Sequence, residues 1–345
     1  NTNQNTTNFG ATGGETFNNL TISKVANANT VTATSTLTIN GALTFTTGTF
    51  NAGAFTHTIN SPAWNDTSAT FTFTPSTSTI LFNSAGFTIN QKATHSFYNL
   101  TIQANGSVLS NGLDVNNDFL LSTGTFGLNQ NMNVGGHFQV NVGTTFSAGS
   151  GTLTFDTNNA RNITVSTANS LGNVTISNTR TMTTDITTAN LTNNSTLTTG
   201  NNTLTVGGNL NNSGGTLTAS AQVAGKFVNI SGNFSNGTFN AGAGTLNFNG
   251  DGTPQIFTPN IGSFGKAQTS GIALVHLNGI STFSSFTTSG GNTLQLDGSS
   301  AICTMNIASG GSFANNGNLV VFSSTNAVTL KSVLTTFNFI GTDID

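Results

Sequence analysis

Charged residues are scarce in this sequence of 345 residues. Seven Lys and Arg and ten Asp and Glu make up 5% of the chain and give a formal charge of −3, whereas roughly a quarter of residues are charged in an ordinary globular protein. No basic run occurs, so binding to nucleic acid or to an anionic bilayer is not expected. A nearly neutral surface also lacks the repulsion that keeps proteins apart, which favours self-association.

Cysteine, glutamate and long apolar runs are also nearly absent. Cys303 is the one cysteine, so an intrachain disulfide is impossible, and its apolar neighbours predict a buried small side chain. No stretch approaches the roughly 20 apolar residues of a membrane-spanning helix, so membrane insertion is not expected. Glu15 is the only glutamate, and paired carboxylates of the kind that glycoside hydrolysis requires do not recur. We expect neither enzyme activity nor a cofactor.

Apolar residues alternate with Thr and Asn throughout the chain. This alternating pattern is clear in residues 37–60, LTINGALTFTTGTFNAGAFTHTIN, and it recurs at Leu113, Met132, Leu204 and Val228. Such alternation predicts strands with one side toward a core and the other toward solvent. The motif Gly-Thr-Phe recurs as well and predicts interior columns of aromatic rings, at Phe50, Phe126 and Phe239.

The spacing of these segments predicts how the strands are arranged. Leu113 and Met132 are 19 residues apart, and Leu204 and Val228 are 24 apart. Antiparallel sandwiches do not usually repeat the same strand and turn at such intervals, whereas each coil of a parallel solenoid stacks on the one before. We therefore predict an all-β fold, a right-handed parallel β-helix of roughly 14 to 17 coils. FNNLTIS at residues 17–23 is echoed by FYNLTI at 97–102, which indicates a larger repeat of several coils.

The predicted domain organisation is one solenoid with an arm. Residues 1–16 contain a single large apolar residue and predict an N-terminal arm, which is a candidate to donate a strand to a neighbour. Residues 17–345 form the predicted solenoid domain. Two irregular segments, 61–68 and 249–270, interrupt the alternating pattern and predict loop insertions.

An apolar last strand is predicted near the other end of the chain. Residues 333–340 alternate in the same way, and an uncapped strand of this kind leaves a sheet edge that tends to find partners. The predicted subunit contacts are therefore Phe9 in the arm and, in this strand, Phe337, Phe339 and Ile340.

Few residues suggest site chemistry. Asp114, Asn116 and Asp118 place three oxygen ligands at alternate positions and are a weak candidate for a calcium site. They lack the following Gly and the later Glu of a calcium loop, so outward solvated side chains are the better interpretation.

The histidines and the two large polar aromatics complete the candidates. His57, His95 and His137 have no second ligand at metal spacing, and neither has His276, so each is expected to be an ordinary ladder residue. Trp64 and Tyr98 are the predicted ligand-binding aromatics, because a loop around Trp64 is the most plausible platform for a sugar.

Three segments of the sequence resemble known proteins. They are FYNLTIQ, LTINGALTFTTGTFNAG and VNISGNFSNGTFNAGAGTLNFNG. They resemble the repeat regions of large secreted β-solenoid surface proteins and adhesins of bacteria, notably those that Bacteroidota export by the type IX route, and more distantly filamentous-haemagglutinin-like adhesins. The resemblance implies an extracellular or cell-surface location and a structural or adhesive task. It transfers no catalytic residue, and no C-terminal sorting domain is recognisable.

Three functions follow as hypotheses. The preferred one is an extracellular structural protein whose copies join head-to-tail through the solenoid ends into a filament or fibrous surface layer. An ice-binding protein is an alternative, because Thr pairs such as Thr56 and Thr58, Thr70 and Thr72, or Thr196 and Thr198 can order water on a regular face. An adhesin that binds glycans or surfaces is another.

Overall fold

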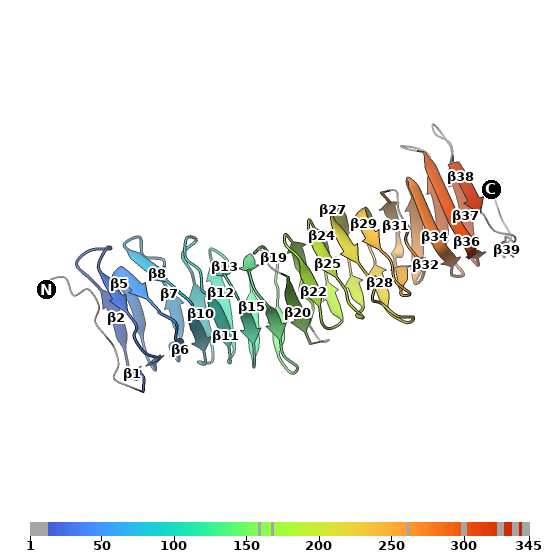
Figure 1. Ribbon diagram of the computed structural model, residues 1–345. Helices are drawn as coiled ribbons and strands as arrows, with labels where there is room; N and C mark the ends of the chain where they lie inside the picture. The colour runs from blue at the N-terminus through green and yellow to red at the C-terminus, as the bar shows by residue number, and fades with distance from the viewer. Residues whose placement is uncertain are drawn as a thin grey trace. The chain divides into compact units, whose positions relative to one another are not determined.

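The computed structural model describes residues 13–157, 160–166, 169–260, 263–297, 302–322, 328–332 and 338–339. These residues form strands and turns, and no helix occurs among them (Figure 1). Parallel strands stack as a β-solenoid of about 14 turns, which confirms the predicted fold class; the right-handed winding stays a prediction. The chain divides into two compact units, 1–173 and 174–345.

Each coil of the first unit contributes short strands to three rows. The first row contains β1 (Glu15–Phe17), β4 (Leu37–Ile39), β6 (Thr56–Ile59), β9 (Thr79–Phe82), β11 (Asn99–Ile102), β14 (Phe119–Leu121), β17 (Phe138–Val140) and β20 (Arg161–Val165). The second contains β2 (Leu20–Ser23), the first part of β5 (Leu43–Asn51), β7 (Ala63–Asn65), β10 (Phe87–Asn90), β12 (Gly106–Ser110), β15 (Thr125–Leu128) and β18 (Thr145–Ser147). The third contains β3 (Thr30–Thr32), the last part of β5, β8 (Phe71–Thr74), β13 (Leu113–Val115), β16 (Met132–Val134) and β19 (Thr152–Phe155).

The second unit repeats this arrangement. One row contains β21 (Asn173–Ile176), β24 (Asn190–Asn193), the first parts of β27 (Leu210–Thr218) and β29 (Phe234–Asn240), β31 (Asp251–Thr258), β33 (Ile272–Leu277), β35 (Thr293–Asp297) and β37 (Asn318–Phe322). The next contains β22 (Arg180–Met182), β25 (Thr196–Thr198), the last parts of β27 and β29, the first parts of β34 (Ile280–Thr288) and β36 (Cys303–Asn315), and β38 (Val328–Ser332). The last contains β23 (Ile186–Thr188), β26 (Leu204–Val206), β28 (Phe227–Ile230), β30 (Thr245–Phe248), β32 (Lys266–Thr269), the last parts of β34 and β36, and β39 (Asn338–Phe339).

The register of these strands follows the spacing seen in the sequence. Leu113 lies opposite Met132, and Leu204 lies opposite Val228, as the repeated sequence pattern predicted. Apolar residues therefore stack on apolar residues from coil to coil, and their Thr and Asn neighbours stack on the outside.

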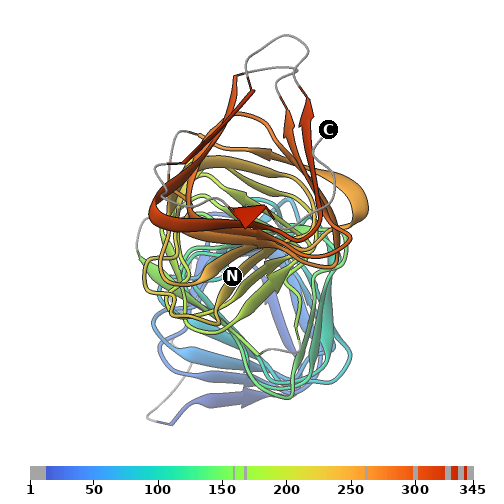
Figure 2. The same cartoon turned by 90° about the vertical axis from the view of Figure 1, so that its right-hand side faces the viewer.

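Figure 2 shows the strands of the coils arranged around an interior. The core of each unit is a column of apolar side chains inside the coils. Phe50 and Phe126 are buried as predicted, and so is Cys303. Many rings stack on one another along the column, for example Phe119 on Phe138 with 5.1 Å between ring centroids. Phe239, the third Phe of the Gly-Thr-Phe motif, differs because it is half-exposed.

Neither predicted loop insertion is a simple loop. Within 61–68, strand β7 pairs with β10 through Trp64 and Ile89, and Trp64 is 1% exposed. Within 249–270, β31 pairs with β33, and β32 pairs with β30. Proline and unusual residues marked these segments in the sequence, but strands of the solenoid lie within both, and the backbone groups of these strands find partners in neighbouring coils.

The predicted arm and last strand lie mostly outside the described residues. Residues 1–12, which include Phe9, are not described, and Glu15 and Thr16 already belong to β1, which pairs with β4. Phe337 and Ile340 also lie outside, and the backbone of Phe339 pairs with Asn315 in β36. The subunit contacts predicted at these residues stay predictions.

Candidate functional site

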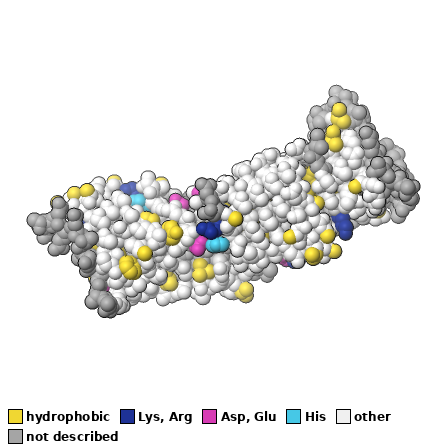
Figure 3. Space-filling model, in the orientation of Figure 1, with side chains coloured by type: hydrophobic (Ala, Val, Ile, Leu, Met, Phe, Trp, Pro, Cys, Tyr) yellow, Lys and Arg dark blue, Asp and Glu magenta, His cyan; other side chains and the backbone are white. Residues whose placement is uncertain are grey.

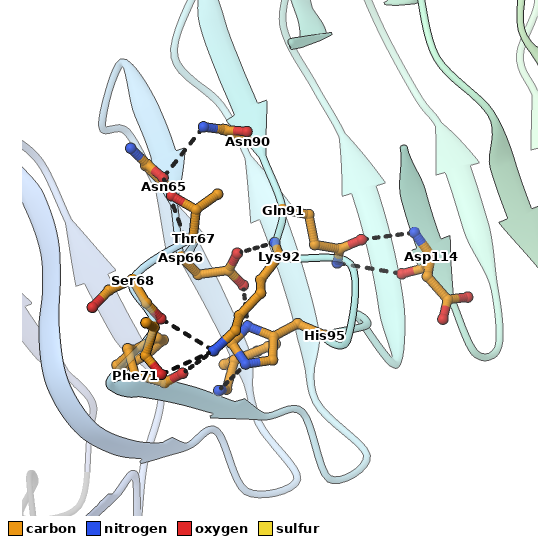
Figure 4. Close-up of polar contacts among 12 residues, drawn as sticks. Asn65, Asp66, Thr67, Ser68, Phe71, Asn90, Gln91, Lys92, His95 and Asp114 are labelled. Carbon is orange, nitrogen blue, oxygen red and sulfur yellow. Dashed lines mark hydrogen bonds and ion pairs between the residues drawn. The ribbon is translucent and has the colours of Figure 1, made fainter. Parts of the chain in front are cut away.

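A cluster of polar side chains in the first unit brings together the charged or titratable residues Asp66, Lys92 and His95 (Figure 4). Asp66 follows β7, and Lys92 and His95 lie in the turn that follows β10. Asp66 is 0% exposed and His95 is 6% exposed. The sequence placed Asp66 in a loop and treated His95 as an ordinary ladder residue, so nothing in it brought these three residues together.

The hydrogen bonds of the cluster fix the state of His95. The backbone N–H of Phe73 donates to His95 Nε2 (3.3 Å), so Nδ1 carries the ring proton and donates to Asp66 Oδ2 (2.9 Å). The other carboxylate oxygen, Oδ1, accepts from the backbone N–H of Lys92 (2.7 Å). Asp66 therefore holds both His95 and the turn that carries it.

Lys92 completes the cluster without pairing to the carboxylate. Its Nζ donates to the backbone carbonyl oxygens of Ser68 and Phe71, each at 3.1 Å. Figure 4 shows the ammonium reaching back across the segment that joins β7 to β8. The charge thus ties one turn to the turn of the preceding coil.

This geometry is suited to holding turns in place. An Asp–His pair supports acid–base chemistry when the second ring nitrogen faces a substrate. Here that nitrogen accepts a backbone N–H and is buried, so proton transfer at Nε2 would require the β8 contact to break. The observed arrangement is therefore a structural one.

Two other histidines also bond to backbone groups. The N–H of Leu37 donates to His57 Nδ1 (3.1 Å), and His57 Nε2 donates to the carbonyl oxygen of Ala52 (2.7 Å). Burial lowers the pKa of His57, and the bond to Ala52 opposes that shift in part. His137 Nδ1 accepts from the N–H of Asn162 (3.1 Å).

The predicted calcium ligands do not form a cluster of acidic groups. Asp114 lies in β13, Asn116 is exposed, and the carboxylate of Asp118 accepts from the N–H of His137 (2.8 Å). Burial, together with the nearby charge of Asp156, raises the pKa of Asp114 to about 6. Among the described residues, no three His, Cys, Asp or Glu side chains are placed to hold a metal ion.

The predicted sugar platform is not on the surface. The ring of Trp64 packs edge-on against Phe45 (4.8 Å) and Phe73 (5.0 Å) in the core, and Tyr98 is half-exposed. The sequence suggested a loop because Trp64 stands between Pro62 and Asp66, but the indole is buried among the Phe rings of the core. A sugar cannot stack on a ring that is 1% exposed.

One groove lies in the second unit. It has a volume of about 500 Å³ and is lined by Asn236, Gly237, Thr238, Phe239, Asn240, Ala241, Asn260 and Ser263. None of these lining residues has a charged side chain. One feature of the sequence could have indicated this groove: the Gly-Thr-Phe motif at 237–239 is followed about one coil later by Pro259 instead of another such motif.

Comparison with protein-family models, with curated proteins and with solved structures gave no match. Among the described residues, no helix has the length and apolar character that crossing a membrane requires.

Proposed function

We propose that this protein is an extracellular structural protein whose β-solenoid units associate with copies of themselves into a filament or fibrous surface layer. The observation that carries the proposal is the nearly uncharged surface built on stacked parallel strands. The view in Figure 3 has few charged side chains on it. The charged contacts of the described residues include the ion pair of Asp185 with Lys226, and Asp66 is hydrogen-bonded to the neutral ring of His95.

Neutral outward side chains bond from coil to coil in this protein. Asn60 Nδ2 donates to Asn40 Oδ1 (2.8 Å), and Asn117 Nδ2 donates to Asn99 Oδ1 (2.8 Å). Ladders of this kind stabilise the stack without charge. Surfaces of this kind approach one another without electrostatic repulsion, which favours association between copies.

The first described coil also offers strand edges. β1 pairs with β4, and β2 and β3 both pair with β5. Within residues 13–157, no further strand covers their opposite edges. A parallel edge of this kind accepts another strand by main-chain hydrogen bonding, which is the contact that a head-to-tail filament needs.

Sedimentation and negative-stain electron microscopy test the proposal. Wild type is expected to form assemblies that grow with concentration. Thr21→Lys places a charge on the exposed position of edge strand β2, and it is expected to shorten the assemblies because charged edge residues block strand addition.

The matched control is Thr145→Lys at an exposed position of β18. If both substitutions shorten the assemblies, the copies associate side by side instead of end to end. A protein that sediments as a monomer at every concentration would contradict self-association.

Ice binding is a second candidate, supported by a regular array of threonines in the second unit. Thr196 lies opposite Thr216 and Thr198 opposite Thr218, and the next strand continues these columns with Thr238 and Asn240. The spacing is roughly 6.6 Å along a strand and roughly 4.8 Å between strands. A flat array of hydroxyl and methyl groups at constant spacing favours ordered water.

The other Thr pairs do not extend this array. Thr56 and Thr58 lie in β6 of the first row, whereas Thr72 lies in β8 of the third row. Thermal hysteresis measured with purified protein tests the candidate. Thr216→Lys is expected to abolish the effect and Thr145→Lys to leave it unchanged, and wild type without hysteresis at high concentration would exclude ice binding.

A further inference from the structure

An outward column of asparagines in the second unit ends at an apolar residue. Asn190 Oδ1 accepts the N–H of Asn209 in the next coil, Asn209 Oδ1 accepts that of Asn233, and Asn233 Oδ1 accepts that of Ile256, each at 2.8 Å. The strand register stacks these four residues on one another. The side chain of Ile256 has no acceptor to continue the column, and it is 44% exposed. An apolar side chain therefore stands on the outer face where three coils in succession have an amide.

Three further apolar side chains lie beside Ile256. Pro254, two residues earlier in β31, is exposed, and half-exposed Leu274 lies opposite it in β33. Ile272, the first residue of β33, is 65% exposed. Alternate residues of a strand point to the same side of the sheet, so these side chains share the outer face. The four residues Pro254, Ile256, Ile272 and Leu274 are called the outer patch below.

The coils on either side of the outer patch present polar residues. Asn233 precedes Ile256 in the column, and Thr293 in the following coil lies opposite Leu274. The outer patch is therefore two strands wide. Single exposed apolar residues are ordinary on a protein surface, whereas several gathered together and rimmed by polar residues mark an interaction site.

The two ends of the outer patch carry opposite hydrogen-bonding groups. Asp251 lies opposite Ile272 at one end, and His276 lies opposite Ile256 at the other. The hydroxyl and the N–H of Thr253 donate to the Asp251 carboxylate and hold the pKa of Asp251 below its usual range. The half-exposed His276 ring carries an N–H donor in either protonation state. An acceptor thus lies at one end and a donor at the other.

We propose that the outer patch binds the outer patch of a second copy of this chain, face to face and with the strands of the two copies antiparallel. The contact is isologous, and its two-fold axis lies between the two faces and passes over Pro254 and Leu274. Antiparallel strands bring the Asp251 end of each copy to the His276 end of the other, so the donor and the acceptor meet twice.

A second copy meets both requirements of the outer patch. The occupant must be flat and apolar at its centre, because the outer patch lies on paired strands of a sheet, and sheet faces pack on one another about 10 Å apart. It must also place a donor over Asp251 and an acceptor over His276. The same surface turned by a half rotation supplies all of these groups.

The contact is expected to be weak by itself. Specific stable interfaces use roughly 20–30 residues from each partner, and the outer patch has far fewer. Such a contact becomes effective where another contact already raises the local concentration of copies. The inference thus rests on the proposed self-association and names the surface through which copies meet side by side.

The test is made in Thr21→Lys, so that side-by-side contact is measured without end-to-end growth. Sedimentation equilibrium up to roughly 1 mM protein is expected to show dimers and nothing larger. Adding Ile256→Asn, which continues the asparagine column, is expected to weaken dimerisation at least about tenfold. The matched control, Val223→Asn, removes a 52% exposed apolar side chain elsewhere in the second unit and is expected to have no effect.

Cysteine and charge variants test the antiparallel orientation. Leu274→Cys places one thiol of each copy near the two-fold axis, and a bifunctional thiol reagent is expected to link the two copies. Thr187→Cys, at an exposed position of β23, is expected to stay unlinked, and the native Cys303 is buried. Asp251→Lys is expected to weaken dimerisation, and addition of His276→Asp is expected to restore it.

Circular dichroism shows whether each variant is folded. The proposal is overturned if Thr21→Lys stays monomeric at millimolar concentration, if Ile256→Asn dimerises like its parent, or if Val223→Asn weakens the dimer equally. Failure to link Leu274→Cys would also overturn it, and so would monomers that bind neutral lipid vesicles through Ile256. If Thr21→Lys dimerises and wild type forms nothing larger than dimers, the outer patch stands and the proposed filament fails. Wild-type filaments together with monomeric Thr21→Lys give the reverse.

Discussion

Buried polar residues in this protein bond to the backbone of neighbouring coils. His57 and His95 each accept a backbone N–H through one ring nitrogen, from Leu37 and Phe73. Both rings are neutral in this arrangement, since one nitrogen accepts and the other donates. Acid that protonates the His57 ring removes the acceptor of the Leu37 N–H, so the stability of the folded protein is expected to depend on pH through this residue.

His57→Gln tests this dependence. Because burial lowers the pKa of His57 in the folded state, the unfolded chain binds more protons once the pH falls below roughly 6.5, and stability is lost in that direction. We expect wild type to lose stability as the pH falls below about 6.5, and His57→Gln to lose less in this direction although it is less stable at pH 7. Urea unfolding across this range measures both. An unchanged slope in His57→Gln would contradict the argument.

Asp114→Asn is expected to act in the opposite direction. The folded-state pKa of Asp114 is raised to about 6, so between about pH 4 and pH 6 the folded protein holds a proton that the unfolded chain has released. The protonated carboxyl of Asp114 therefore favours the folded state at low pH, and this contribution is lost as the pH rises through about 6. Asp114→Asn is therefore expected to raise the midpoint of thermal unfolding at pH 7.5 and to leave it nearly unchanged at pH 4. A lower midpoint at pH 7.5 would show that the carboxylate has a favourable partner, such as a cation.

At the scale of elements, one motif builds different rows of the solenoid. In FNNLTIS, Phe17 ends β1 in the first row and Leu20 begins β2 in the second. In FYNLTI, Phe97 bridges to Val115 in the third row and Leu100 lies in β11 of the first. The motif therefore specifies a corner followed by a strand, and the row in which it falls depends on the lengths of the coils before it.

Three buried asparagines, Asn193, Asn212 and Asn236, form a hydrogen-bonded ladder between coils of the second unit. Breaking this ladder is expected to lower the free energy of unfolding. Asn212→Ala removes the acceptor of Asn193 and the donor to Asn236 and Thr238. Leaving buried polar groups without partners costs about 1–3 kcal/mol each, so we expect a loss of about 3 kcal/mol in the free energy of unfolding. Asn194→Ala, at the exposed position beside Asn193, is expected to cost less than about 0.5 kcal/mol. Chemical denaturation gives both values, and equal costs would show that the ladder adds nothing.

At the scale of the whole molecule, the low charge predicts how salt would act on the self-association proposed above. With 5% charged residues, association through neutral surfaces and main-chain hydrogen bonds should not weaken as salt screens charge. We expect assemblies to persist or lengthen from low salt to roughly 1 M salt, where the Debye length falls to about 3 Å. Sedimentation across this range checks the expectation, and dissociation at high salt would show that charge pairing holds the copies together.

The strands were predictable because alternation and coil spacing are local properties of the sequence. The stacking of Leu113 on Met132 could be predicted directly from the repeated sequence motif. The placement of Trp64 could not, since a single large ring between Pro62 and Asp66 looks the same in a loop as in a coil. The Asp66–His95 pair was also missed, because its members are separated by 29 residues and come together when one coil closes over another.

The sequence by itself determined that this protein is a stack of parallel strands with apolar residues inside and Thr and Asn outside, since the period of two and the repeat of about 20 residues allow few other folds. Tertiary structure alone decided which side chains the stack buries and where a groove opens on it. Coil lengths vary, so each residue's neighbours above and below are fixed only when the whole chain has wound. The groove beside Phe239 is the clearest case: its motif matches those of Phe50 and Phe126, and the coil that follows makes the difference.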